Sequence, residues 1–230
     1  MYHRAKLHFK KADPILYRAA KLHKIADIRR SRDIFGDLVH AIVNQQLSGK
    51  AADTIYGRLE AKCKTQNAKL KIEDVNKLDE GKLKHVKGWG GNKSSNITPQ
   101  AILNLSTSSM RTCGLSEAKT KSIKGLAKAA VRKDIDLAKI HLHDDEKIME
   151  LLTSIKGIGP WTAEMILMFS LGRQDIFSKG DLGLRKGIMH LYGLKKMPSD
   201  RTIEKLAKRW SPYRTYAARV LWRVADGEKK

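Results

Sequence analysis

The 230-residue chain has only two cysteines, Cys63 and Cys113. Two thiols can form neither a disulfide framework nor a four-cysteine metal cluster, and this usage is typical of a reducing compartment. The chain also lacks an apolar run long enough to span a bilayer, and its first residues lack the apolar segment of a signal peptide. We therefore expect an intracellular protein, in the cytoplasm or nucleoid or in a eukaryotic nucleus, that is not secreted.

Strand-like alternation of apolar and polar residues is scarce, whereas helical patterns dominate. Asp33 precedes an apolar stripe with helical spacing, and Ser48 is a candidate cap for the next helix. Thr98 and Pro99 begin a short helix, because proline suits the first helical position. Further helices are indicated after Gly114 and over residues 144–152. These patterns predict an all-α chain.

Positive charge is in large excess: 46 Lys and Arg face 24 Asp and Glu, for a formal net charge of +22. Such a surplus attracts polyanions, which include DNA, RNA and an anionic membrane face. The plain alternative is a solvated surface that keeps the protein soluble. RNA and membranes have no support here beyond the charge itself.

The most informative motif is a glycine hairpin, Lys156-Gly157-Ile158-Gly159-Pro160, at the start of an apolar helix. The backbone N–H groups of such a hairpin can face a phosphate, and the helix behind it adds the positive end of its dipole. We expect Gly157 and Gly159 to be needed for a positive φ or for close approach of a phosphate. Gly172 is expected to end the helix in a left-handed conformation.

A single acidic residue, Asp181, stands at the expected start of helix 182–192. Aspartate is among the best N-caps, so the plain alternative is that Asp181 only caps this helix. The two roles are compatible, because N–H groups that bond a capping carboxylate keep it ionised. A fixed anion can stabilise a developing sugar oxocarbenium ion or orient a water molecule. Phosphate binding together with one carboxylate indicates chemistry on a nucleic acid.

Three segments of the chain, residues 43–55, 155–187 and 210–223, resemble in sequence and in order the helix–hairpin–helix GPD superfamily of DNA glycosylases. They read VNQQLSGKAADTI, IKGIGPWTAEMILMFSLGRQDIF followed by GDLGLRKG, and WSPYRTYAARVLWR. Within the superfamily the chain is most similar to the 3-methyladenine DNA glycosylase II, or alkylbase glycosylase, family. The hairpin block is highly specific, and the other two segments support it.

The resemblance implies an all-α fold of two lobes with a DNA cleft between them. By the family's division, the central lobe would run over residues 35–173 and end in the helix–hairpin–helix. Residues 1–34 plus 174–230 would form the other, discontinuous lobe. The chain resembles the compact form of the family, which lacks an extra N-terminal β domain.

The resemblance also implies the roles of individual residues. Asp181 matches the family's catalytic aspartate, and Gln46 matches the residue that fills the gap left by a flipped nucleotide. The expected base pocket consists of Trp161, Trp222 and Met165. The expected DNA-binding residues are Gln46, Lys156, Gly157, Ile158, Gly159 and Thr162. As plain alternatives, Gln46 only decorates a helix end and Trp222 is ordinary core.

Trp161 bears on the mechanism. Bifunctional members of the superfamily place at this position a lysine that attacks the sugar, which tryptophan cannot do. Lys156 lies at the other side of the hairpin, outside that position. The lack of a four-cysteine cluster also separates the chain from the iron–sulfur branches. The resemblance therefore implies a monofunctional glycosylase, which releases a base and leaves an abasic site.

The expected substrates are 3-methyladenine and 7-methylguanine in duplex DNA, because tryptophan faces attract cationic rings by roughly 0.5–2 kcal/mol. Two alternatives stay open: a glycosylase of this fold for the deaminated bases hypoxanthine and uracil, and a non-catalytic DNA-binding protein. A zinc deaminase is excluded, because the paired-cysteine ligand pattern is missing. We expect a monomer without a required cofactor, although hairpin carbonyls of this superfamily can bind an alkali metal ion.

Two features depart from the commoner family form. The element before Asp181 reads Ser178-Lys179-Gly180 and lacks the frequent proline, which puts the rigidity of this loop in question. Residues 64–97 are long, lysine-rich and polar, and they include a Gly88–Ser95 loop. We interpret them as a flexible surface insertion, either an extra DNA contact or a disordered insert.

Overall fold

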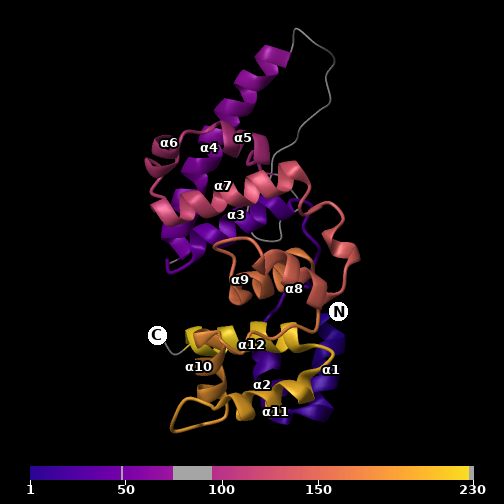
Figure 1. Ribbon diagram of the computed structural model, residues 1–230. Helices are drawn as coiled ribbons and strands as arrows, with labels where there is room; N and C mark the ends of the chain where they lie inside the picture. Colours follow the sequence, from indigo (N-terminus) through magenta and orange to yellow (C-terminus); the bar gives the residue numbers. More distant parts are fainter. Residues whose placement is uncertain (48, 75–94, 228–230) are drawn as a thin grey trace. The chain divides into compact units, whose positions relative to one another are not determined.

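A computed structural model describes residues 1–47, 49–74 and 95–227. Within 49–74, the side chains are described for residues 49–68. Every regular element among these residues is helical, which confirms the predicted all-α class (Figure 1). The helices are α1 (Tyr2–Ala12), α2 (Pro14–Leu22), α3 (Ile34–Asn44), α4 (Gly49–Asp74), α5 (Pro99–Asn104), α6 (Thr107–Arg111), α7 (Glu117–Arg132), the 3₁₀ turn η1 (Ile140–Leu142), α8 (Asp145–Thr153), α9 (Pro160–Met165), the π-helical turn η2 (Ile166–Ser170), α10 (Leu182–Leu191), α11 (Asp200–Trp210) and α12 (Arg214–Gly227).

The chain divides into two compact units. We call Arg30–Leu171 the central unit, and Met1–Arg29 with Gly172–Lys230 the terminal unit. The central unit contains α3 to η2, and the terminal unit combines α1 and α2 with α10, α11 and α12.

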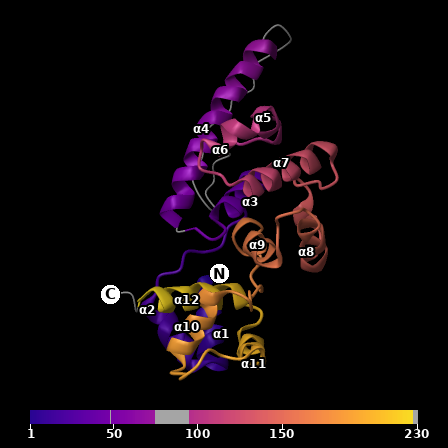
Figure 2. The same cartoon turned by 60° about the vertical axis from the view of Figure 1, so that its left-hand side comes forward.

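In the terminal unit, α10 lies against α12, and α2 contacts both (Figure 2). Its apolar core includes the fully buried side chains of Phe9, Trp210 and Tyr216. Asp13 is buried here with three donors to its carboxylate: the Leu16 N–H, the Tyr192 hydroxyl and the Trp210 indole N–H. Burial of a carboxylate costs free energy unless the group is hydrogen-bonded, and these three donors offset the desolvation of Asp13.

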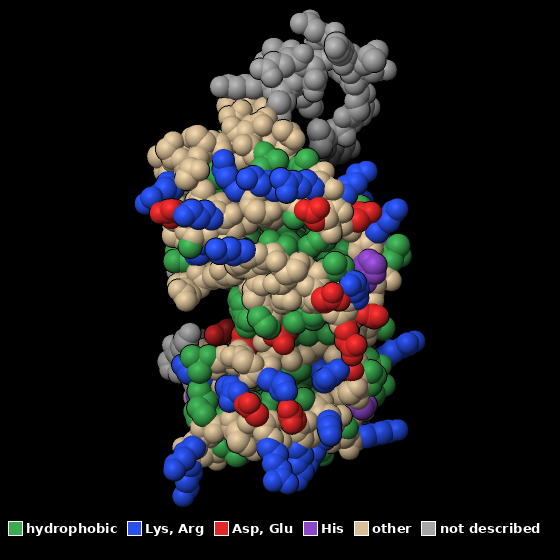
Figure 3. Space-filling view, viewed as in Figure 1, with side chains coloured by type: hydrophobic (Ala, Val, Ile, Leu, Met, Phe, Trp, Pro, Cys, Tyr) green, Lys and Arg blue, Asp and Glu red, His purple; other side chains and the backbone are tan. Residues whose placement is uncertain are grey.

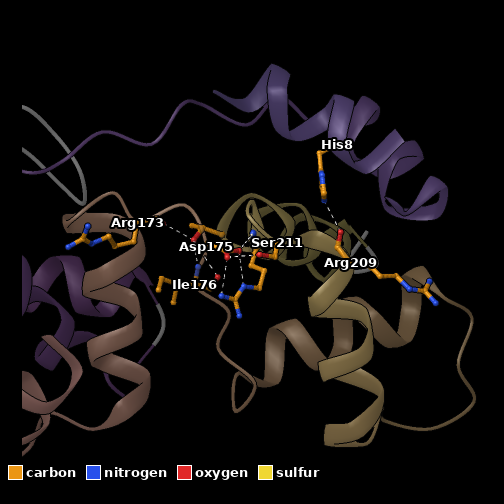
Figure 4. A network of polar contacts seen from close by, with 8 residues as sticks. His8, Arg173, Asp175, Ile176, Arg209 and Ser211 are labelled. Carbon is orange, nitrogen blue, oxygen red and sulfur yellow. Dashed lines mark hydrogen bonds and ion pairs between the residues drawn. The ribbon is translucent and has the colours of Figure 1, made fainter. Parts of the chain in front are cut away.

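A second polar network fixes the start of α12 (Figure 4). Arg214 donates to both oxygens of Asp175, at 2.8 and 3.1 Å, and the Ser211 hydroxyl donates at 2.7 Å. Although burial raises the pKa of Asp175, the hydrogen bonds from Arg214 and Ser211 hold it below its usual value. The Thr215 hydroxyl accepts from the Ile176 N–H at 3.0 Å. The segment that leads to Asp181 is thereby tied to α12.

In the central unit, α3 is apolar and almost wholly buried, and it lies beside α7 in both views (Figure 1, Figure 2). The predicted end signals are confirmed. Asp33 caps α3 by accepting from the Gly36 N–H at 2.8 Å, and Thr98 caps α5 with Pro99 in the first turn. Gly172, at φ +73°, follows η2 as expected for a left-handed helix end.

Two sequence-based expectations require correction. The predicted flexible insertion over 64–97 begins in fact as helix, because α4 continues to Asp74. Residues 64–74 contain no Gly or Pro, and three Lys with one each of Gln, Ala, Leu and Glu give the segment helical propensity without an apolar stripe. Ser48 and the 75–94 part of that insertion lie outside the described residues. The helix predicted after the hairpin is not α-helical throughout, because α9 passes into a π-helical turn at Ile166.

The two cysteines are free and fully buried. Burial raises the pKa of the Cys63 thiol to about 12, so the folded state disfavours its thiolate. We expect Cys63 to resist alkylation at pH 8 in the native protein and to react in denaturant. The free energy of unfolding should also fall as the pH rises above the ordinary thiol value of about 8.5, because only the unfolded chain then releases the proton. Labelling followed by mass spectrometry checks the first point, and native labelling as fast as in denaturant would contradict it.

Candidate functional site

The glycine hairpin connects α8 to α9 in the central unit. Ile155 and Ile158 are buried on its inner side, and the Ile158 N–H donates to the Ile155 carbonyl at 3.0 Å. Lys156 and Gly157 are exposed at its tip. Gly159 stands at the N-cap position of α9 without a capping side chain. The first turn of α9 thus has no capping side chain at its N-cap, and a helix start of this kind is where phosphates can bind.

The local structure requires glycine at one position of the hairpin and not at the other. Gly157 has φ +94°, and an added Cβ would stand 2.0 Å from Oγ of Ser122 on α7. Gly159 has φ −90°, and an added Cβ would meet nothing within 4 Å. The protein's own packing thus requires glycine only at position 157. Close approach of a bound backbone is the remaining reason for Gly159, and that role stays a prediction.

Beside the hairpin, the chain leaves α3 through Gln45 and Gln46. The side-chain amide of Gln45 donates to the Gly157 carbonyl at 3.0 Å and to the Thr162 hydroxyl at 3.1 Å. Gln46 is exposed and has φ +57°, which is uncommon for a residue with a side chain. Because the Thr162 side chain is buried and accepts from Gln45, its predicted DNA contact would have to use the backbone N–H.

Asp181 caps α10 in the terminal unit, as predicted from the sequence. Its Oδ1 atom accepts from the Leu184 N–H at 2.8 Å and from the indole N–H of Trp222 on α12 at 2.9 Å. The positive end of the α10 dipole lies at the same carboxylate. Two donors on one oxygen fix the carboxylate in one orientation, which suits a group that must face a reacting atom.

Two glycines of α10 make this approach of Trp222 sterically feasible. A Cβ at Gly183 would lie 3.0 Å from Cδ1 of Trp222, and one at Gly187 would lie 2.3 Å from the carbonyl oxygen of Leu221. Gly183 and Gly187 are four residues apart and therefore share one face of the helix. Their small size lets α12 pack close enough to α10 for the indole to reach the carboxylate.

The loop before Asp181 is held in place without the family's frequent proline. The guanidinium of Arg185 donates to the Lys179 carbonyl at 2.9 Å and to the Pro198 carbonyl at 3.2 Å, and it pairs with Asp200. The Asp181 N–H closes the turn onto the Ser178 carbonyl at 3.2 Å. Arg185 thus supplies the restraint that the sequence alone left in question.

The predicted base-pocket residues come from both units. Trp161 is half-buried near the start of α9 and Met165 is buried at the end of that helix, both in the central unit. Trp222 belongs to the terminal unit and is bonded to Asp181. The contact of Trp222 with the carboxylate cannot be predicted from the local sequence, because it joins residues 41 positions apart.

Two carbonyl groups of the hairpin have donors within the protein, since the Gly157 carbonyl accepts from Gln45 and the Ile155 carbonyl from Ile158. An alkali metal ion held by hairpin carbonyls stays a prediction. Among the described residues, no group of three or more His, Cys, Asp or Glu side chains could hold a metal ion. A cavity of about 400 Å³ in the central unit is lined by residues 30–35, Leu137, Ala138, His141 and Leu171, none of which is a predicted site residue.

Basic side chains form a row over α7 on one face of the central unit (Figure 3). Lys121, Lys124, Lys128 and Arg132 of this helix recur at helical spacing and share one face. Lys119 is turned instead to the end of α3, and Ser122 touches the hairpin tip.

The structure thus contains the two features on which the sequence resemblance rests, a glycine hairpin between two helices and an aspartate at the start of a helix. A family model described as "HhH-GPD superfamily base excision DNA repair protein" matches residues 39–212. The chain therefore belongs to the helix–hairpin–helix GPD superfamily, as its sequence indicated.

Several relatives in this superfamily are similar over nearly the whole chain. DNA-3-methyladenine glycosylase 1 of Schizosaccharomyces pombe is 30% identical over 228 residues, which cover 96% of this chain and 87% of that protein. The solved complex of an S. pombe 3-methyladenine DNA glycosylase with abasic DNA has a TM-score of 0.71 at 28% identity, covering 96% of this chain and 95% of that one. A DNA-3-methyladenine glycosidase from Bacillus halodurans has a TM-score of 0.72 at 30% identity, covering 96% and 90%. The predicted glycosylase fold is thus confirmed.

No helix in the described part of the chain is both long enough and apolar enough to cross a membrane.

The contrast between the two hairpin glycines gives a matched pair of variants. Gly157→Ala should lower the free energy of unfolding by about 1–3 kcal/mol, because the residue is held at positive φ against Ser122. Gly159→Ala should leave thermal stability unchanged and weaken DNA binding by about tenfold or more, because a methyl group would displace a phosphate from charged hydrogen bonds. Thermal melts and fluorescence anisotropy at fixed salt measure the two effects. Wild-type DNA affinity in Gly159→Ala would rule out the phosphate contact.

Proposed function

We propose that this protein is a monofunctional DNA glycosylase of base excision repair, which releases 3-methyladenine and 7-methylguanine from duplex DNA with Asp181 as its catalytic carboxylate. The observation that carries the proposal is the fixed carboxylate at the start of α10, with the Leu184 N–H and the Trp222 indole on one oxygen. Three similar proteins and structures that bear the name of this activity, covered over most of their length, support the substrate class.

In this mechanism Asp181 acts on the sugar. As the bond between C1′ and the base nitrogen breaks, its electron pair neutralises the cationic ring of the alkylated base. The positive charge that develops on the sugar is stabilised by the carboxylate. A water molecule oriented by Asp181 then forms the new C1′–O bond and gives up a proton to the carboxylate and on to solvent. Because the base leaves as a neutral molecule, no separate acid has to protonate it.

The hairpin and Gln46 act on the DNA itself. The N–H groups of Gly157, Gly159 and the first turn of α9 would hold a phosphate, with Lys156, Ile158 and Thr162 flanking it. Gln46 would fill the space left when the damaged nucleotide turns out of the duplex. Lesions that pair and stack poorly cost least to extrude, which adds selectivity. The protein would act as a monomer on one duplex.

The base would be recognised by aromatic and sulfur-bearing side chains. Trp161, Met165 and Trp222 are the proposed contacts, and indole faces favour a cationic ring over a neutral one. Trp222 would have two roles: its indole N–H orients the Asp181 carboxylate, and its ring would contact the damaged base. Trp161 stands where a lysine nucleophile would be needed for strand cleavage, so the product would be an abasic site in an intact strand.

The direct test compares Asp181→Asn with wild type. Asparagine caps a helix as well as aspartate does and retains an oxygen for the Leu184 and Trp222 donors, so the variant should fold normally. Release of 3-methyladenine and 7-methylguanine from methylated duplex DNA should fall by about 100-fold or more, while DNA binding survives. Asp144→Asn, the same change at the cap of α8, is the matched control and should keep full activity.

Each alternative predicts its own result in this assay. Efficient release of hypoxanthine or uracil in place of alkylated purines would identify a glycosylase for deaminated bases. Binding of DNA by the wild type without release of any damaged base would identify a non-catalytic DNA-binding protein. Unchanged activity in Asp181→Asn would remove this carboxylate from the mechanism.

Trp222→Phe separates the orienting role of the indole N–H from its ring. The variant keeps an aromatic face but loses one hydrogen bond to a charged group, an interaction of about 1.5–3 kcal/mol. The single-turnover rate of base release should therefore fall by about tenfold or more, with little change in affinity for DNA that contains an abasic site. A wild-type rate in this variant would show that the hydrogen bond to Asp181 does not matter for the reaction.

A further inference from the structure

Three segments of the central unit meet around the Gln46 loop: the end of α3, the tip of the hairpin and one face of α7. The Gln46 loop is defined here as residues 44–47. It belongs to the same compact unit as the hairpin, so their relation is internal to one unit. Two sets of hydrogen bonds and one van der Waals contact join these segments in a closed ring.

The first link of the ring is Lys119 of α7. Its ammonium group donates to the carbonyl oxygens of Val43 and Gln45, each at 2.8 Å. The last carbonyls of a helix have no intrahelical partner and attract a cation. Burial lowers the pKa of Lys119, as expected for an ammonium group partly withdrawn from water. Lys119 thus holds the end of α3 at the point where the loop begins.

The second and third links involve the hairpin. The Gln45 side chain joins the loop to the hairpin through the Gly157 carbonyl and the Thr162 hydroxyl. Gly157 in turn lies against Ser122, which is one turn after Lys119 on α7. Each of the three segments therefore contacts the other two.

Next to this ring lies Gln46, whose backbone conformation is uncommon. Gln46 has φ +57°, and the Leu47 N–H closes the turn onto the Asn44 carbonyl at 3.2 Å. A left-handed residue other than glycine persists only where its surroundings determine it. Lys119 bonds the carbonyl of the peptide that leads into Gln46, and the side chain of Gln45 bonds the hairpin. These bonds hold the residue before Gln46 and so help to determine its conformation.

We propose that Lys119 and Gln45 are positioning residues, which hold Gln46 in its DNA-inserting conformation before DNA binds and fix it to the phosphate-binding hairpin. This inference rests on the proposed function, in which Gln46 fills the gap in the duplex. Engagement of a phosphate by the hairpin then places Gln46 at a set distance along the DNA. Entry of Gln46 requires no separate ordering of its loop, so less conformational entropy is lost on binding.

A direct phosphate contact by Lys119 is the competing role, and it makes a different prediction. Two of the three N–H donors of its ammonium group already bond protein carbonyls. Loss of a lysine that neutralises a phosphate reduces the slope of log affinity against log salt by about one. Loss of a positioning lysine leaves that slope unchanged while impairing base flipping.

The first experiment uses the free, full-length protein. Amide hydrogen exchange of residues 44–47 is compared in wild type, Lys119→Met and Gln45→Leu, with Lys128→Met on the exposed side of α7 as the matched control. We expect about tenfold or faster exchange of the loop in the first two variants and wild-type exchange in the control. Lys119→Arg should restore protection, because a guanidinium group also donates to two carbonyls. Equal exchange in all variants would overturn the proposal.

The second experiment measures base flipping without chemistry. In the Asp181→Asn background, the variants bind a duplex with 2-aminopurine beside an abasic-site analogue, and fluorescence reports unstacking. Lys119→Met and Gln45→Leu should lose most of the flipping signal at saturating protein, with the wild-type salt slope. A preserved signal, or a slope reduced by about one in Lys119→Met, would overturn the proposal. A thermal melt shows whether each variant is folded, and Gln45→Leu supplies the test if Lys119→Met is not.

Failure of the inference and failure of the proposed function are distinguishable. Hydrogen exchange requires neither DNA nor catalysis, so unchanged loop protection in the variants counts against the inference alone. A wild type that releases no damaged base counts against the proposed function alone.

Discussion

The chemistry proposed for this protein depends on one close helix contact, the packing of α10 against α12. Gly183 and Gly187 remove the side chains that would separate these helices, and the Trp222 indole then reaches Oδ1 of Asp181. The Leu184 N–H holds the same oxygen. A carboxylate fixed in this way is ready to meet positive charge without reorganising, which is how preorganised groups lower a barrier. The rest of the terminal unit, including the Arg185 and Asp175 networks, keeps the two helices and the preceding loop in place.

The central unit contains the hairpin and the Gln46 loop, the parts proposed to contact DNA. In the proposed function, backbone N–H groups of a hairpin held by buried isoleucines would meet a phosphate of the DNA. The Gln46 loop lies beside this hairpin, joined to it by Gln45 and to α7 by Lys119. In the proposed mechanism, phosphate binding thus belongs to the central unit and the catalytic carboxylate to the terminal unit. Mutations in one should leave the internal geometry of the other unchanged.

The helix ends and the site residues differ in how far the sequence predicts them. Caps at Asp33, Thr98 and Asp181 depend on the residue itself and its next few neighbours, so they could be predicted. The partners of Asp181 and Gly157 could not, because Trp222 is 41 residues from the first and Gln45 is 112 from the second. The different requirements at the two hairpin glycines could not be predicted from the sequence either. The φ angles and the clearances around each Cα show that packing requires glycine at position 157 and not at position 159. The extension of α4 was missed because its last turns have helical propensity without an apolar stripe.

In the proposed mechanism one fixed carboxylate suffices, because the substrate base is already a good leaving group. The decisive measurement is single-turnover release of 7-methylguanine and of hypoxanthine from duplexes that are identical except at the damaged base. We expect rapid release of 7-methylguanine and release of hypoxanthine slower by roughly 100-fold or more, since a neutral base needs a positioned acid. Equal rates for the two bases, or faster release of hypoxanthine, would contradict this mechanism.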